Sequence, residues 1–296
     1  MNSLLHGKSS PLKKKKPNKF ENKKYMGQKT NSIIFRLGQK NSEWKYKYIE
    51  KNKEESSLLL YKTVEIQKYV DNTLKFYGLL LHNCKIEYTG TRADFHISMC
   101  ESQPKIGNEN LANSKKLISF LLKKVLTVGI NLYIKNKTVN VKIQNLTKKF
   151  ELNIKKNVTY YRDYKSVLPK LRRFLKNSDQ KSFIKLLFIS TYERGSAKLL
   201  ADCIAFYILK NKKRHNFLLF ILKLTLTEII KLNFSKVKGI KINISGRLNG
   251  APRAKKKTLK IGETPLQSFN ANIDYCNSTS YTQNGTFGIK VWMCEK

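Results

Sequence analysis

Apolar and polar residues alternate most regularly near the end of the chain, where residues 239–245 read GIKINIS. A period of two is typical of a strand that buries one face, so the three isoleucines of this run are predicted to point into a core. The run ends in a turn bracketed by Gly246 and Gly250, because glycine tolerates the backbone conformations that tight turns need.

A second pattern occupies the first half of the chain. Apolar residues spaced three and four apart predict helices over residues 58–76 and 113–128. Two short strands, 84–88 and 93–99, lie between these helices, and a third strand over 139–143 follows them. The predicted order is helix, strand, strand, helix, strand, which many small α/β units share.

The stretch from residue 147 to 196 interleaves aromatic residues with cations. Such a mixture can stack bases and neutralise phosphates, or it can form the core edge and solvated rim of an extra helix. Pro169 would interrupt any long helix here. The residues concerned are Tyr160, Tyr161, Arg162, Tyr164, Arg172 and Arg173. An amphipathic helix is then predicted from Ser196 to about Lys210, and a second one over 217–232.

Charge restricts the kinds of partner. The chain has 296 residues, with 59 Lys+Arg against 20 Asp+Glu, which gives a net charge of +39 spread along its whole length. Self-repulsion of this size favours a polyanion as partner. A membrane surface is also anionic, but it usually attracts one polybasic patch or one amphipathic helix. The longest apolar run, 217–222, is too short to span a bilayer.

Cations gather around the glycine turn near the end of the chain. Fixed cations beside a closely approaching backbone suit a phosphate chain, because they release its condensed counterions. A hairpin with solvated lysines is the alternative. The turn holds Arg247 and is followed by Arg253, Lys255, Lys256 and Lys257.

Two signatures at opposite ends of the chain carry a resemblance. One reads MGQKTN over 26–31 with FRLG over 35–38. The other reads GIKINISGRLNGA over 239–251, then PL at 265–266, NANIDY over 270–275 and GTFGIKVWM over 285–293. Together they closely resemble a bacterial-type ribosomal protein family, the KH-containing third protein of the small subunit. The resemblance is weak between the two signatures.

The resemblance implies an α+β fold: a degenerate type II KH-like domain, and a carboxy-terminal domain of two helices and a four-stranded, mainly antiparallel sheet. The expected divisions are a basic disordered extension (1–25), an arm and helix (26–70), the KH-like domain (71–146), an inserted basic region (147–196) and the carboxy-terminal domain (197–296). The KH loop that grips phosphates would be GNEN at 107–110. Asn110 there replaces the second glycine after Gly107, and Glu109 is unfavourable, so we expect the fold to persist as a scaffold without the grip.

The family position implies partners in the small subunit: its rRNA, neighbouring proteins of the head and of the mRNA entrance, and mRNA itself. The expected rRNA contacts are Lys13, Lys14, Lys15, Lys16, Gln28, Lys29, Arg36, Ser245, Arg247, Arg253, Lys255, Lys256 and Lys257. The family lines the mRNA entrance with cations on its last two helices. Here the matching part of the second helix is apolar, and the candidates are the basic knot Lys210, Lys212, Lys213 and Arg214. A solvated turn or an ordinary rRNA contact is the alternative for this knot.

Catalytic chemistry is not indicated. The sequence has no nucleotide-binding loop, HExxH helix or GxSxG elbow, so we expect no enzyme and no cofactor. Five scattered cysteines without a CxxC pair predict neither a zinc site nor a disulfide framework. We expect no homo-oligomer and no membrane partner.

Codon bias bears on the location. Few arginines and abundant Asn, Ile, Phe and Tyr favour A/T-rich codons, hence an organelle, with the mitochondrial matrix preferred to the plastid. A free-standing organellar splicing or maturation factor, and a DNA-binding nucleoid protein, are the alternative functions.

Overall fold

The computed structural model describes residues 30–38, 46–50, 52–101, 111–134, 137–174, 178–192, 196–211, 214–232 and 235–296. Asn31–Lys296 forms one compact unit, separate from Met1–Thr30. It combines helices with two four-stranded sheets, which is the α+β class that the sequence predicts.

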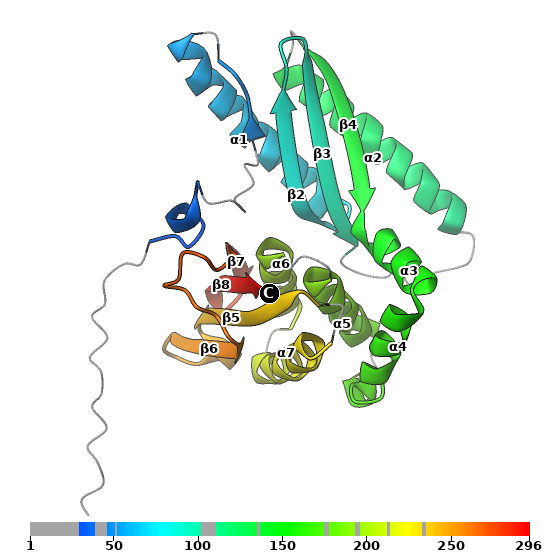
Figure 1. Ribbon diagram of the computed structural model, residues 1–296, viewed down its shortest axis with the longest axis vertical. Helices are drawn as coiled ribbons and strands as arrows, with labels where there is room; N and C mark the ends of the chain where they lie inside the picture. The colour runs from blue at the N-terminus through cyan, green and yellow to red at the C-terminus, as the bar shows by residue number, and fades with distance from the viewer. Residues whose placement is uncertain are drawn as a thin grey trace, which may run out of the picture. The chain divides into compact units, whose positions relative to one another are not determined.

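The first sheet has the strand order β1-β2-β3-β4, with β2 and β3 antiparallel and β3 and β4 parallel. Helices α1 and α2 lie along it (Figure 1). Its elements are β1 (Tyr46–Lys47), α1 (Lys53–Phe76), β2 (Leu79–Tyr88), β3 (Arg92–Glu101), α2 (Leu111–Tyr133) and β4 (Thr138–Asn145), after a short 3-10 helix η1 (Ile34–Arg36). All five predicted helices and strands of this region are confirmed, and each is longer than predicted.

Alternation along β3 sorts its side chains between two faces. Phe95 and Ile97 are fully buried and pack with Ile66 of α1 and Leu126 of α2 in one apolar core. His96, between them in sequence, points to the opposite face. One face of this first sheet is therefore sealed by helices, while the other carries polar side chains.

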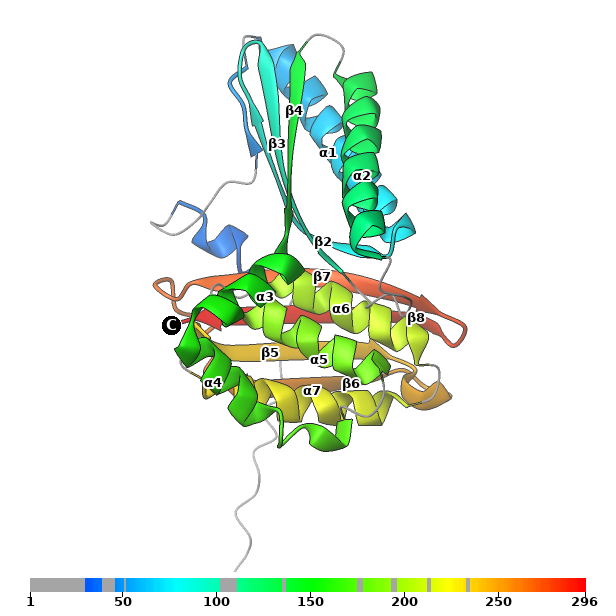
Figure 2. The ribbon, with the colours of Figure 1, turned by 90° about the vertical axis from the view of Figure 1, so that its right-hand side faces the viewer.

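The second sheet has the order β6-β5-β8-β7 and is antiparallel throughout. Figure 2 shows α6 and α7 lying across one face of it. The hydroxyl of Ser196 accepts a hydrogen bond from the Leu199 N–H and so caps α6, as expected for a serine at this position. The elements are α6 (Ala197–Lys210), α7 (His215–Ile230), β5 (Val237–Gly246), η3 (Leu248–Gly250), β6 (Lys255–Gly262), β7 (Ile273–Thr282) and β8 (Gly285–Glu295).

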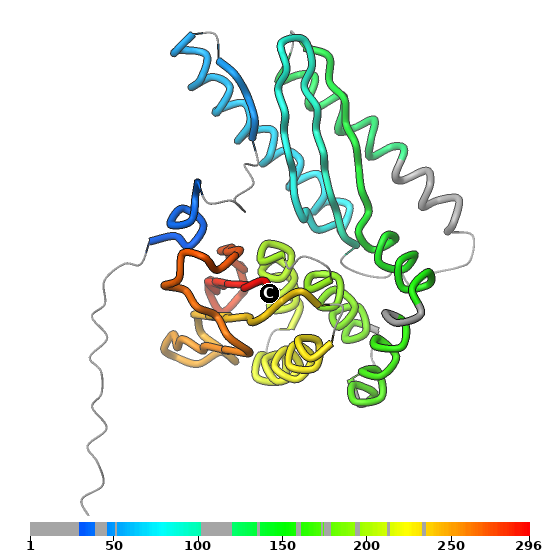
Figure 3. Tube along the Cα trace, in the orientation of Figure 1, coloured from blue at the N-terminus to red at the C-terminus, as the bar shows by residue number. Residues whose placement is uncertain are grey.

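Between the two sheets, the chain forms α3 (Leu146–Lys156), α4 (Val158–Val167), η2 (Arg172–Phe174) and α5 (Ser178–Thr191), which can be followed in Figure 3. Helix α5 packs against both α6 and α7, and its Phe188 is fully buried in the same core as the second sheet. These helices therefore add a third layer behind α6 and α7. Helix α4 ends just before Pro169, as the proline predicts.

The aromatic residues of the inserted region were open to two interpretations. Tyr164 meets Phe150 and Phe188 edge to face at centroid distances of 6.2 and 5.0 Å, so it belongs to the core edge. Tyr161 is about half exposed, with the Lys165 ammonium 5.8 Å from its ring. The extra-helix interpretation therefore fits Tyr164, and the inserted region forms several helices instead of one.

Gly239 offers a test of the packing of β5. A Cβ atom at this position would lie 2.2 Å from the Glu263 backbone oxygen, where the chain cannot yield easily. Gly239→Ala should therefore cost about 1–3 kcal/mol of unfolding free energy, measured by urea denaturation. Gly90→Ala is the control, because nothing lies within 4 Å of its added methyl. Equal losses in the two variants would contradict this packing.

Candidate nucleic-acid interface

The turn after β5 holds Arg247 in a fixed frame. A Cβ at Gly246 would come within 2.4 Å of the Phe287 ring, so only glycine fits there. Asn249 adopts the left-handed conformation (φ 55°), which asparagine tolerates better than most residues. Arg247 is exposed, and its Nε donates to the Ala251 carbonyl at 2.8 Å. The turn thus presents an anchored guanidinium at the surface.

His215, the first residue of α7, fastens this turn to the helix. Its backbone N–H donates to Asn249 Oδ1, and the Asn249 N–H donates to His215 Nδ1, both at 2.9 Å. The imidazole is 2% exposed and lies 5.2 Å from the Phe287 ring, centroid to centroid. Burial lowers the pKa of His215, because desolvation disfavours the charged ring. A neutral ring suits the pair, since Nδ1 must remain an acceptor.

The face of the second sheet opposite α6 and α7 carries aromatic and cationic side chains. Lys260, Lys241, Trp292 and Tyr275 stand in one row across β6, β5, β8 and β7. The Trp292 and Tyr275 rings lie 5.2 Å apart, and the Lys241 ammonium is 5.4 Å from the Trp292 ring. Flat rings beside ammonium groups match the combination that binds unstacked bases and phosphates.

Two further rows continue this surface. Asn243 pairs with Lys290 in the second row, and Lys256 pairs with Ser245 in the third. None of the three rows contains an acidic residue. We call this surface the open sheet face: Lys241, Asn243, Ser245, Lys256, Thr258, Lys260, Tyr275, Asn277, Thr279, Gly288, Lys290 and Trp292.

The predicted rRNA contacts in this region separate between the two sides of the sheet. Ser245 and Lys256 belong to the open sheet face, whereas Lys255 and Lys257 project to the helix side of β6. The Lys257 ammonium donates to Asn216 Oδ1 near the start of α7. Arg253 is exposed in the loop before β6. The lysine run is therefore not one continuous patch.

Arg36 differs most from its expected role. It is 7% exposed, and its guanidinium donates to the carbonyls of Ser32, Leu266 and Ser268 at 2.9, 2.9 and 2.6 Å. The neighbouring Phe35 ring stacks on Phe269 at 4.1 Å. In this arrangement the guanidinium fastens the amino-terminal motif to the β6–β7 loop and is not presented to a phosphate.

Several residues of the open sheet face were missed from sequence: Lys241, Lys260, Lys290, Trp292 and Tyr275. The signal was present, because the alternation that points three isoleucines of β5 inward also points Lys241 outward. Its importance becomes clear only when the register across four strands places these side chains in one row.

The basic knot is only partly described. The Lys210 ammonium pairs with Asp179 of α5 at 2.5 Å, and Arg214 is exposed directly before α7. The outward Phe217 ring of α7 lies 5.7 Å from the Phe174 ring of the inserted region. This apolar side of α7 therefore contacts the inserted region.

Other expectations lie outside the described residues. They concern the extension over 1–25 and its Lys13 to Lys16, then Gln28, Lys29, Gly107, Asn110, Lys212 and Lys213. Across the described ranges, no group of three or more His, Cys, Asp and Glu residues is arranged to hold a metal ion. Within the same ranges, no helix has both the length and the apolar character to cross a bilayer.

Residues 221–293 match the family described as ribosomal protein S3, C-terminal domain. The match begins within α7 and contains every residue of the open sheet face. The family match therefore covers one continuous segment from α7 to β8.

Individual proteins named small ribosomal subunit protein uS3 or uS3c also match parts of this chain. The small ribosomal subunit protein uS3 of Bacteroides thetaiotaomicron is 57% identical over 56 residues, which is 19% of this chain and 23% of the relative. Protein uS3c of Staurastrum punctulatum is 36% identical over 131 residues, 44% of this chain and 58% of the relative. Protein uS3c of Euglena longa is 42% identical over 84 residues, 28% and 36% of the two chains.

The matched segments thus span from about a quarter to just over half the length of these relatives. The chain resembles the uS3 ribosomal proteins, as its two signatures predict. The relatives are named as ribosomal proteins and not as enzymes, in agreement with the expectation from sequence.

Titration of His215 generates a pH prediction. Its pKa is lower in the folded chain than in the unfolded chain, so the unfolded state takes up the proton first as pH falls. The stabilisation that comes from keeping His215 neutral is complete above about pH 6.5. It declines as the pH falls below this value, by at most about 1.4 kcal/mol for each pH unit by which burial lowers the pKa of His215. His215→Asn keeps a side-chain acceptor but does not titrate in this pH range. The free energy of unfolding of this variant, measured by urea denaturation, should therefore fall less steeply below about pH 6.5 than that of the parent chain. Parallel curves for the two proteins would contradict this assignment.

Arg36 generates a stability prediction. Arg36→Lys keeps the charge, but one ammonium cannot span carbonyls that a planar guanidinium reaches together. We expect a loss of about 1.5–3 kcal/mol and faster hydrogen exchange over residues 265–269. Arg92→Lys is the control, because Arg92 is exposed on β3. If both variants showed the same hydrogen exchange as the parent chain over residues 265–269, the structural role assigned to Arg36 would be wrong.

Proposed function

We propose that this chain is a structural, RNA-binding protein of the small ribosomal subunit of bacterial type, and not an enzyme. The observation that carries the proposal is the match of residues 221–293 to the S3 carboxy-terminal domain, because that segment contains the whole open sheet face. The KH-like identity of the first α/β unit belongs to the same proposal. Its support is the order α1, β2, β3, α2, β4.

Electrostatics favours rRNA as the partner of the open sheet face. Lys241 and Lys260 stand directly opposite each other on neighbouring strands, and like charges in that position destabilise a sheet. Phosphates between them would turn this repulsion into attraction. Asn243 adds a polar group to the same surface: it is 8% exposed, and its Oδ1 has no hydrogen-bond partner among the described residues. A base or ribose donor would satisfy such an oxygen after a small side-chain movement.

Position in the subunit is the finer part of the proposal. By resemblance, the chain lies in the head on rRNA, beside neighbouring proteins, with the α6–α7 connection facing the mRNA entrance. Arg214 is the exposed described cation of that connection, whereas Lys210 is engaged by Asp179. A solvated turn or an ordinary rRNA contact is the alternative for the knot.

The compartment is proposed on the relatives. The uS3c relatives are of chloroplast type, which favours the plastid over the mitochondrion preferred from sequence. A tagged chain in cell fractions distinguishes the two, because it must accompany the ribosomes of one organelle.

Co-sedimentation tests the function itself. A subunit protein should remain with small subunits in high salt, whereas a free-standing maturation factor should be released. A nucleoid protein should instead bind duplex DNA at least as well as rRNA. Recovery of the chain only in ribosome-free fractions would overturn the proposal.

The open sheet face generates a quantitative prediction. Replacing Lys256, Lys260 and Lys290 with Gln should weaken rRNA binding and reduce the slope of log affinity against log salt by roughly 2–3, about 0.7–0.9 per lost phosphate contact. The RNA-free variant should be at least as stable as the parent, because Lys260 no longer opposes Lys241.

The matched control removes the same charge elsewhere. Lys123, Lys155 and Lys223 are exposed lysines on α2, α3 and α7, and Gln at all three should leave most of the slope intact. Equal slopes in the two triple variants would mean that net charge, and not this face, determines binding.

A further inference from the structure

A cavity of about 600 Å³ lies between the open side of the first sheet and the inserted helices. Strands β2, β3 and β4 supply one wall, and α3 with the end of α5 supplies the other. Its volume is in the range of sites that take up a small molecule or one group of a larger one. Neither the sheet nor the inserted helices form it alone.

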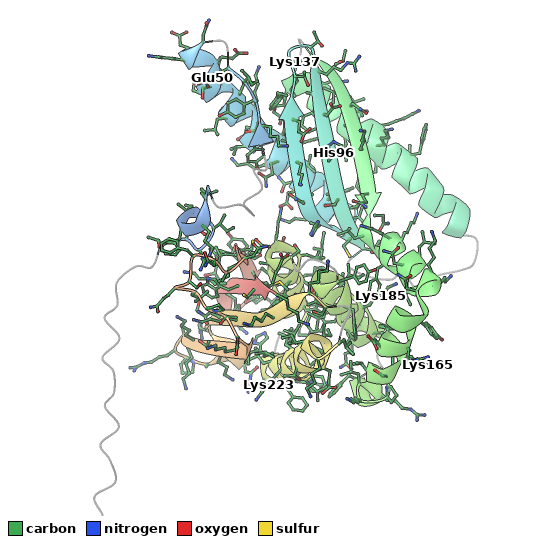
Figure 4. All side chains as sticks on the ribbon, viewed as in Figure 1. Glu50, His96, Lys137, Lys165, Lys185 and Lys223 are labelled. Carbon is green, nitrogen blue, oxygen red and sulfur yellow. The ribbon has the colours of Figure 1, made fainter. Side chains whose placement is uncertain are left out.

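The sheet wall is basic. Lys85, His96 and Lys142 stand in register across β2, β3 and β4, so three basic side chains project in one row. Figure 4 marks His96 near the middle of β3. Among the described residues that line the cavity, none is acidic. This arrangement attracts an anion and repels a cation.

The same wall offers further hydrogen-bonding groups beside the lysines. His82 Nδ1 lies 2.8 Å from Ser98 Oγ, and Ser98 neighbours Gln144 in the register. Hydroxyl, imidazole and amide groups can hydrogen-bond a ribose or a base edge. The cavity is therefore not suited to inorganic phosphate alone.

The inserted region supplies the other wall, which is made of aromatic and aliphatic residues and one lysine. Phe150 and Tyr192 meet edge to face at 5.2 Å, and Ile189 lies beside them. Lys149 of α3 adds a third lysine to the lining. An aromatic wall opposite a cationic wall fits a nucleotide, whose base is flat and apolar and whose phosphate is charged.

We propose that this cavity binds one unstacked nucleotide of a single-stranded RNA segment. Its phosphate lies at the row Lys85, His96 and Lys142, and its base lies against Tyr192. The inserted region thereby gains a role, since it completes an RNA site on the first sheet. This inference rests on the proposed ribosomal function and adds a contact that the carboxy-terminal domain does not provide.

The test uses the full chain and a short oligouridine as probe. Gln at Lys85, His96 and Lys142 should weaken oligouridine binding about tenfold at low salt, because the row that holds the nucleotide's phosphate loses both of its ammonium groups and its imidazole. The control triple at Lys123, Lys155 and Lys223 should weaken it far less. Equal losses would overturn the proposal.

Ultraviolet cross-linking of the parent chain provides a second measurement that needs no variant to fold. Oligouridine should cross-link to the peptide containing Tyr192, and Tyr192→Leu should abolish that cross-link. Cross-links confined to other peptides would overturn the proposal. So would a protein, and not RNA, found cross-linked at this peptide in purified small subunits.

Co-sedimentation of the variants with small subunits separates the two proposals. If the pocket variant stays with subunits but binds oligouridine like the control triple, the pocket is not an RNA site and the ribosomal function stands. If the parent chain fails to accompany subunits, the ribosomal function fails, whatever oligouridine does.

Discussion

Mutual repulsion of positive charge is the constraint on which the rest of this structure depends. With 59 basic and 20 acidic residues, the chain cannot pair its cations internally. Some described carboxylates instead link separate segments: Glu228 of α7 pairs with Lys170, and Glu151 of α3 pairs with Lys185 of α5 (Figure 4 labels Lys185). Glu228 also pairs with Lys231 at the end of its own helix. Such exposed pairs contribute about 0–1 kcal/mol each, so apolar packing has to hold the fold.

This apolar packing joins the first sheet, the inserted helices and the second sheet, which the sequence predicts as separate divisions of the chain. Leu80 and Cys100 belong to the first sheet, yet both are buried with the core of the second sheet and the inserted helices. Thr147 strengthens the junction, because its hydroxyl accepts the Glu101 N–H at 3.2 Å and lies 3.3 Å from Cys100 Sγ. The inserted region therefore shares one apolar core with the second sheet and its helices, and this core also takes in Leu80 and Cys100 of the first sheet.

A consequence of this arrangement is a division of labour between the two sheets. Each seals one face with helices and leaves basic and polar groups on the other. On the second sheet that face is broad and carries Trp292 and Tyr275, whereas on the first sheet the inserted helices narrow it into a cavity. On the second sheet the Lys241 ammonium lies beside the Trp292 ring, whereas lysines of the first sheet and aromatic residues of the inserted region line opposite walls of the cavity.

Local sequence determined α1, β2, β3, α2 and β4, the start of α6 and the end of α4, because side-chain periodicity, the Ser196 cap and the break at Pro169 act over a few residues. It did not determine the inserted region, which forms several helices where one extra helix was predicted. Local sequence also determined that one face of β5 is buried, and the net charge of +39 favours a polyanion as partner. Only tertiary structure decided which cations share a surface. Arg36 contacts carbonyls some 230 residues away, so nothing near it in sequence indicates that it is buried. Lys255 and Lys256 are neighbours on opposite faces, and the walls of the cavity come from segments whose proximity depends on how the whole chain packs.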